Sequence, residues 1–186
     1  LMTITGLIDA PKADKEFLSI NGAQGFSTFY GYYMLEAMAT AGNYQGALDV
    51  IREYWGAMID LGATSFWEDF DINWIPNAVP IDELVPEGKK DIHGDCGAYC
   101  YVGFRHSLCH GWASGPTSWL SRHILGVEVI EPGCRQVRIT PHLGDLKWVK
   151  GTFPTPYGEI QIYHEKQANG NVISEVKAPK GVSVIK

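Results

Sequence analysis

The sequence lacks the features that mark several large classes of protein. No apolar run reaches the roughly 18 residues that a membrane-spanning helix needs. The first residues, LMTITGLIDAPKADK, have neither the basic start nor the small-residue cleavage site of a signal peptide. Lys and Arg (15) are fewer than Asp and Glu (21) and form no cluster. We therefore expect neither a membrane span nor a nucleic-acid partner.

Common enzyme signatures and abundant cysteines are also missing. The sequence contains no G-x-S-x-G elbow, phosphate-binding loop or dinucleotide fingerprint, so acyl transfer and nucleotide chemistry have no support. Its four cysteines are too few for a disulfide-built scaffold, and they leave periplasmic, secreted and cytoplasmic locations open. We expect no bound cofactor.

What remains is the composition of a folded protein. The hydrophobic fraction is 45% and the charged fraction is 19%, which argues against a disordered chain. A length of 186 residues suffices for one good core, or for one domain and a small second one. Because the chain begins at Leu1 without an initiator Met, we expect it to be part of a longer protein.

Two amphipathic helices are predicted in the first third of the chain. Apolar residues recur with helical spacing over residues 26–41 and again over residues 44–59. Asn43 is the expected N-cap of the second helix, and Gly62 is its expected C-terminal cap. A connection of two or three residues folds two such helices into an antiparallel hairpin.

The middle of the chain is predicted to be mostly irregular. Helical periodicity disappears over residues 62–93, where prolines and acidic residues alternate, and loops of this length are usually functional or disordered. Further helices are predicted over residues 99–108 and 116–125, the second beginning with a proline at its first position and ending at Gly126.

After Gly126 the apolar pattern changes to a period of two. It predicts short strands in QVRIT, LKWVKGTF, GEIQIYHE, NVISEVK and VSVIK, with a hairpin turn at NGN, residues 169–171. The fold class predicted from periodicity is therefore α+β, with paired helices first and a small antiparallel β unit last. We set the two domains at residues 1–130 and 131–186.

The stretch GATSFWEDFD, residues 62–71, places three acids among aromatic residues. Aromatic rings near a carboxylate tune its acid strength, and rings beside acids also suit a sugar, whose apolar face stacks while its hydroxyls are hydrogen-bonded. The alternative is structural: Asp69 and Asp71 cap a following turn, Glu68 is solvated, and Trp67 and Phe70 lie in the core.

Two further patterns carry candidate chemistry. The run from His93 to His110 spaces its histidines and cysteines somewhat like zinc ligands, but Cys96 and Cys100 also fit one face of a helix as buried, reduced residues, so we expect no metal. In SLCHGWASGPTSWL, His110 and Trp112 precede a helix start and form a candidate sugar subsite. A structural role for His110 is the alternative.

Taken together, the motifs resemble one enzyme family. GATSFWEDFD, SLCHGWASGPTSWL, LGV and ITPHLGDLKWVKGTFPTPYGEIQI occur in the order found at the C-terminal end of bacterial α-L-rhamnosidases of glycoside hydrolase family 78. The preceding segment, residues 25–68, is similar to the helical hairpin that leads into the GAT...WE segment of that family. The resemblance covers nearly the whole chain.

The resemblance implies an architecture and a reaction. Members hydrolyse terminal α-linked L-rhamnose with inversion, in an (α/α)6 barrel of paired helices followed by a β-sandwich. By motif position, Glu68 matches the general base that activates water, and His110 matches a position near the sugar. Trp67 and Trp112 match less specifically, as walls of the pocket. The implied partner is a carbohydrate substrate.

The sequence departs from the family in one important respect. An inverting glycosidase needs a second carboxyl group about 6.5 to 9.5 Å from the base. The family takes this general acid from a motif upstream, which has no match here, so we expect an inactive fragment that self-associates through uncovered helix faces. The alternatives are another sugar-active enzyme with the same barrel and sandwich, or a non-catalytic carbohydrate-binding domain.

Overall fold

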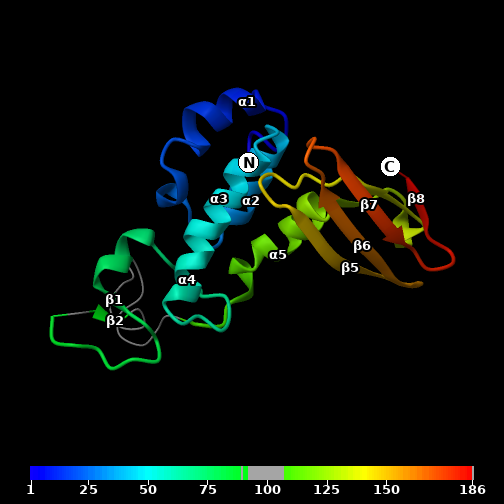
Figure 1. The fold of residues 1–186 in the computed structure, drawn as a ribbon. Coiled ribbons are helices and arrows are strands. Elements are labelled where there is room, and N and C mark those ends of the chain that lie inside the picture. Colours follow the sequence, from blue (N-terminus) through cyan, green and yellow to red (C-terminus); the bar gives the residue numbers. More distant parts are fainter. Residues whose placement is uncertain (89, 92–106, 186) are drawn as a thin grey trace. The chain divides into compact units, whose positions relative to one another are not determined.

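The computed structural model describes residues 1–88, 90–91 and 107–185 (Figure 1). The chain divides into two compact units, which we call unit 1 (Leu1–Pro116) and unit 2 (Thr117–Lys186). Unit 1 is helical and irregular, whereas unit 2 consists mainly of β-strands. In the part of the chain that the structure describes, no helix is long and apolar enough to cross a membrane.

The helical hairpin predicted for unit 1 is confirmed. Its first arm is α2 (Gly31–Thr40), and its second arm runs without interruption through α3 (Tyr44–Val50), the π-helical turn η3 (Ile51–Trp55) and α4 (Gly56–Asp60). Asn43 caps the second arm by accepting a hydrogen bond from Gly46 N at 3.0 Å. The arms are antiparallel, because Gly31 at the start of α2 packs on the Trp55 ring near the end of the second arm.

A short N-terminal region, which was not predicted from the sequence, packs against this hairpin. It contains α1 (Ala10–Ala13), the π-helical turn η1 (Asp14–Leu18) and the 3-10 turn η2 (Gly22–Gly25). Asp9 caps α1 through Lys12 N, and a carboxylate oxygen of Asp14 accepts a hydrogen bond from Asn43 Nδ2 at 2.8 Å. These elements are too short to produce a periodic signal and depend on such contacts.

The region after Gly62 is largely irregular, as predicted, but it contains three short elements. These are the 3-10 helix η4 (Ile72–Asn77) and the strands β1 (Ala78–Val79) and β2 (Lys90–Asp91), which pair in parallel. Most of the helix predicted over residues 99–108 lies outside the described residues.

Unit 2 is a two-sheet sandwich entered through a helix. The helix consists of α5 (Gly115–Trp119), which begins at the end of unit 1, and the π-helical turn η6 (Leu120–Ile124), after which Gly126 has a φ of +78°. A single 3-10 turn, η7 (Pro132–Cys134), lies between the first two strands. The strands are β3 (Val127–Val129), β4 (Gln136–Ile139), β5 (Trp148–Thr155), β6 (Gly158–Lys166), β7 (Val172–Lys177) and β8 (Ser183–Ile185).

The strands form the sheets β3–β4–β8 and β5–β6–β7 (Figure 1). All pairs are antiparallel except β4–β8, which is parallel and therefore differs from the predicted all-antiparallel unit. Leu125, which directly follows the helix, and buried residues of both sheets form one core: Leu125, Val127, Val137, Ile139, Ile160 and Ile162. Burial of alternate residues on facing sheets stabilises such a sandwich.

The predicted α+β class is confirmed, whereas the predicted barrel is not present in the described residues. The described residues contain no closed ring of paired helices. The compact units divide after Pro116, earlier than the predicted division after Ile130. The physical reason is that Leu125 belongs to the core of the sandwich and β3 pairs with β4, so the segment before residue 131 folds with the strands.

Unit 2 contains a fully buried histidine, His164. The His164 side chain is fully buried, with Nδ1 2.7 Å from Ser174 Oγ and Nε2 3.1 Å from the Leu125 carbonyl oxygen. Burial lowers the pKa of His164, although the hydrogen bond to Leu125 opposes this effect. Burial, and then the nearby His123, also lowers the pKa of His142.

We expect unit 2 to lose stability as the pH falls below about 6.5, the pKa of an unfolded histidine. Below this pH the unfolded chain binds protons that the folded chain does not. The stability that the neutral histidines contribute is therefore fully present above about pH 6.5 and is lost progressively as the pH falls further. Urea unfolding at pH 7.5 and pH 5.0 measures the loss. His164→Gln should reduce the loss without abolishing it, because His142 remains; an unchanged loss in this variant would contradict the role of His164.

Candidate functional site

Two segments of unit 1 meet at the acid-rich stretch. The backbone of residues 66–68 pairs with that of residues 107–110, because Glu68 N donates to the Ser107 carbonyl at 2.8 Å and His110 N donates to the Phe66 carbonyl at 2.7 Å. The pairing joins GATSFWEDFD to SLCHGW, two motifs that are far apart in the sequence. The structure thus brings together two of the predicted site segments.

The Glu68 carboxylate lies at this junction and is held by it. Glu68 Oε2 accepts a hydrogen bond from Ser107 N at 3.0 Å and lies 3.9 Å from His110 Nδ1. The side chain is 16% exposed, so solvent reaches a carboxylate that the protein otherwise surrounds. A backbone N–H is a fixed donor, and it orients the carboxylate.

The backbone of Glu68 is fixed as firmly as its side chain. Its carbonyl oxygen accepts two hydrogen bonds, from Thr28 Oγ1 at 2.5 Å and from Trp112 Nε1 at 2.6 Å. A carbonyl oxygen has two lone pairs, so both donors are accommodated. Two separate segments, one at Thr28 and one spanning residues 107–112, therefore determine the position of Glu68.

Aromatic rings form one side of the site. The rings of His110 and Trp112 have centroids 4.1 Å apart, and Phe29 lies 5.5 Å from Trp112. Trp112 is 43% exposed and Phe29 is 42% exposed. Exposed rings beside a carboxylate provide an apolar surface for the C–H face of a sugar.

Trp67 lies in the core of unit 1. Its side chain is fully buried, and its ring packs edge-on against Phe70 with centroids 6.0 Å apart. Phe70 in turn packs against Tyr54, whose hydroxyl donates to the Phe70 carbonyl. Burial raises the pKa of Tyr54 far above its usual value, and Asp69 and Asp71 add to this rise. Trp67 as a pocket wall stays a prediction, and its observed contacts are those of a core residue.

The acids that follow Glu68 have local structural contacts. Asp71 is the N-cap of η4 and accepts hydrogen bonds from the backbone and side-chain amides of Asn73, each at 2.9 Å. Asp69 Oδ1 accepts from Phe70 N at 2.9 Å. The capping role considered for Asp71 is thus observed.

The zinc-like run cannot be followed through the structure. His93, Cys96, Cys100 and His106 lie outside the described residues. Among residues 1–88, 90–91 and 107–185, no group of three or more His, Cys, Asp or Glu side chains is arranged to hold a metal ion.

Several residues that build the site were not predicted from the sequence. Thr28 and Phe29 were assigned only to the start of a helix, and Ser107, the first residue of SLCHGWASGPTSWL, was given no role of its own. Thr28 and Glu68 are 40 residues apart, so no local pattern connects them. Only the fold reveals that the segment before α2 completes the site.

Comparisons with known proteins agree with the motifs. The family described as "Bacterial alpha-L-rhamnosidase C-terminal domain" matches residues 126–185, which correspond closely to unit 2. No curated protein matches the chain. The predicted resemblance to the C-terminal part of family 78 α-L-rhamnosidases is confirmed.

Solved structures match over most of the chain. The GH78 family rhamnosidase of Bacillus sp. GL1 is 29% identical with a TM-score of 0.69, and the match covers 93% of this chain and 16% of that one. The α-L-rhamnosidase of Dictyoglumus thermophilum (24% identity, TM-score 0.60, 84% and 15% covered) shares the fold. The α-L-rhamnosidase of Streptomyces avermitilis, solved in complex with L-rhamnose, also shares the fold (19% identity, TM-score 0.60, with 83% of this chain and 13% of that one covered). The chain therefore spans about a sixth of the relatives it matches.

Proposed function

We propose that this chain, which corresponds to the C-terminal part of a family 78 α-L-rhamnosidase, contributes the general base and part of the sugar pocket to an inverting glycoside hydrolase. In this proposal the complete enzyme releases terminal α-L-rhamnose from glycosides or polysaccharides. Glu68 activates the attacking water, and His110 and Trp112 contact the sugar.

The arrangement around Glu68 supports this proposal. A general base must hold a fixed position within hydrogen-bonding distance of the water that it activates. The contacts of Glu68 with Ser107, Thr28 and Trp112 fix both its carboxylate and its backbone, and its side chain is still reached by solvent. The exposed Trp112 ring lies beside it. A carboxylate that is fixed by these contacts and still reached by solvent is the single observation on which the proposal mainly rests.

The second carboxyl group of the proposed mechanism comes from outside this chain. An inverting enzyme places its general acid about 6.5 to 9.5 Å from its base. In the resembling family this acid belongs to an upstream part of the helical barrel, and the chain matches only 16% of the Bacillus enzyme. We propose that α2–α4 is one hairpin of that (α/α)6 barrel.

Under this proposal, the 186-residue chain alone does not hydrolyse an aryl α-L-rhamnoside above the uncatalysed rate, because protonation of the leaving group is missing. The assay measures release of the aryl group. A separate sedimentation experiment tests for self-association of the chain through exposed apolar residues such as Phe17 and Ile59. The complete enzyme should release rhamnose of inverted anomeric configuration, which NMR detects. Turnover by the chain alone that disappears in Glu68→Gln would overturn the fragment proposal.

A non-catalytic carbohydrate-binding domain is the second candidate, and the exposure of Trp112 and Phe29 favours it. In that case Glu68 only accepts a sugar hydroxyl, and Glu68→Gln leaves the turnover of the complete enzyme nearly unchanged. A third candidate is an enzyme with the same fold that acts on another sugar. Testing the complete enzyme on a panel of aryl glycosides distinguishes this candidate from a rhamnosidase.

A further inference from the structure

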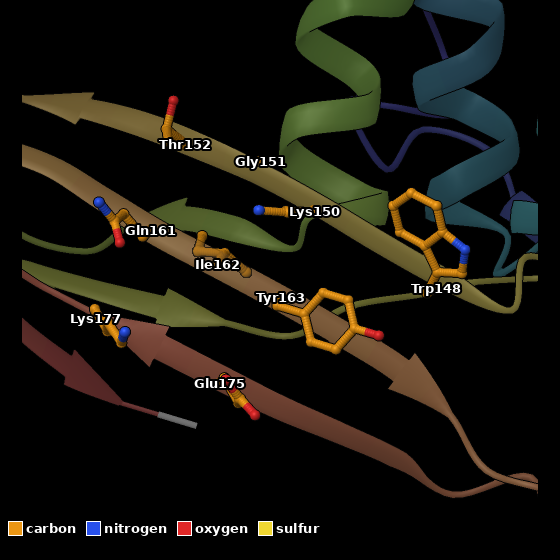
Figure 2. A pocket seen from close by; sticks show the side chains of 9 residues that line it. All are labelled: Trp148, Lys150, Gly151, Thr152, Gln161, Ile162, Tyr163, Glu175 and Lys177. Carbon is orange, nitrogen blue, oxygen red and sulfur yellow. The ribbon is translucent and has the colours of Figure 1, made fainter.

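The outward side of the sheet β5–β6–β7 carries an open hollow of about 880 Å³ (Figure 2). Residues alternate along these strands, so Val149, Ile160 and Ile162 face the core while their neighbours face outward. Among the outward side chains that line the hollow are Trp148, Lys150, Gln161, Tyr163, Glu175 and Lys177. We call this surface the outer face; unit 2 builds it alone. Its volume lies within the range of small-molecule sites, roughly 300 to 1,000 Å³.

Two aromatic rings lie at one end of the outer face. Trp148 is 60% exposed, an unusual exposure for a large apolar ring. Trp148 pairs with Glu165 across the strands, which places Tyr163 in the diagonal position, about 7 to 8 Å away. The Tyr163 hydroxyl donates to Glu165 Oε2 at 3.2 Å, which restrains this ring. Figure 2 shows both rings above neighbouring strands at the same end of the hollow.

Hydrogen-bonding groups of both kinds occupy the rest of the outer face. The register places Lys150, Tyr163 and Glu175 in one row across the sheet. The next row contains Gln161 beside Lys177. Lysine donates, glutamate accepts, and the glutamine amide does both. A sugar ring requires this mixture, because each of its hydroxyl groups both donates and accepts.

The same composition argues against a protein partner. The buried centre of a protein–protein interface is depleted of charged residues, Lys and Glu in particular. Here the charged residues Lys150, Glu175 and Lys177 lie within the hollow itself, not around a dry apolar centre. Positive and negative groups both occur, so a polyanion is not favoured either. A neutral, hydroxyl-rich ligand with an apolar ring face fits best.

We propose that the outer face is a carbohydrate-binding site that holds a saccharide chain of the substrate polymer, with the sugar stacked on Trp148 and its hydroxyls bonded by the two polar rows. The ligand class rests on the proposed function, since the substrate there is a rhamnoside. The site requires no catalytic group, and its role is to retain the polymer near the enzyme.

The test is affinity electrophoresis of the 186-residue chain in native gels that contain a soluble polymer of α-linked L-rhamnose. The polymer should retard the chain, and Trp148→Ala should weaken binding about tenfold, the expected loss of one stacking contact. Gln161→Ala, which keeps the ring, should weaken binding by a smaller factor. Phe17→Ala is the matched control, because it removes a ring that is 72% exposed in unit 1.

Three results would overturn the inference: no retardation of the unmodified chain, equal retardation of the chain and of Trp148→Ala, or equal retardation in dextran. A failure of this inference can be told apart from a failure of the proposed function. The proposed function is tested by hydrolysis of a small aryl rhamnoside by the complete enzyme, and Trp148→Ala should leave the rate of this hydrolysis unchanged.

Discussion

Replacing Glu68 with Gln in the complete enzyme that we propose is expected to lower kcat for an aryl α-L-rhamnoside by about 10² to 10⁴, the range that a general base contributes. Gln keeps the size of the side chain, and its amide oxygen can still accept the hydrogen bond from Ser107 N, but it cannot take a proton from water. KM should change little, since the pocket keeps its shape. Steady-state kinetics of the purified variant provide the measurement.

Asp71→Asn is the matched control for Glu68→Gln. It removes a carboxylate three residues away, and Asn is also a good N-cap, so the contacts with Asn73 should be retained. We expect kcat within about twofold of the unmodified enzyme, because Asp71 acts only on local structure in our interpretation. Equal losses in the two variants would mean that the acidic cluster, not Glu68, supports turnover. Full activity of Glu68→Gln would exclude its role as the base.

The second large effect concerns stability. Gly126→Ala is expected to destabilise unit 2 by more than about 3 kcal/mol. Gly126 has a φ of +78°, which L-residues disfavour, and a Cβ atom there would lie 2.4 Å from the Thr140 carbonyl carbon and 2.5 Å from Pro141 N. Both are backbone atoms and cannot rotate away. Urea unfolding followed by circular dichroism measures the loss.

Gly133→Ala separates the cost of a positive φ from the cost of the steric clash with backbone atoms. Gly133 has a similar φ of +74°, but no atom lies within 4 Å of the position its Cβ would take. We expect a loss of about 1 to 2 kcal/mol, which is the conformational cost alone. If the two variants lost equal stability, the close approach of residues 140–141 to Gly126 would have no energetic consequence, and the stated reason for the larger effect would be wrong.

Regular elements were predictable from the sequence because their signals are local. The hairpin arms have an apolar residue every three or four positions, and Asn43 and Gly62 mark one arm at both ends, as observed. Strands β5 to β7 alternate between exposed and less exposed residues over at least five positions. By contrast, β3 has three residues and the parallel pairing of β4 with β8 joins distant segments, so neither could be inferred from periodicity.

The site was predictable only in its motifs. The acid at residue 68 and the His-Gly-Trp segment were identified because their types and order resemble one family, and the structure places them together. Thr28 and Phe29 gave no signal of a role in the site, and Ser107 was identified only as part of its motif, because their roles arise from contacts between distant segments. Trp67 and Trp112 were assigned the same role, yet one is fully buried and the other is 43% exposed, a difference that residue type does not reveal.

The two hydrogen bonds to the Glu68 carbonyl have a consequence for how the site forms. Their donors are 40 and 44 residues away from Glu68 along the chain, on opposite sides of it. Closing two such long loops costs chain entropy, so we expect these two contacts to form late in folding. We then expect the carboxylate to reach its final position only after the hairpin and the segment that follows Ser107 have docked, so that a partly folded chain would carry Glu68 without a site.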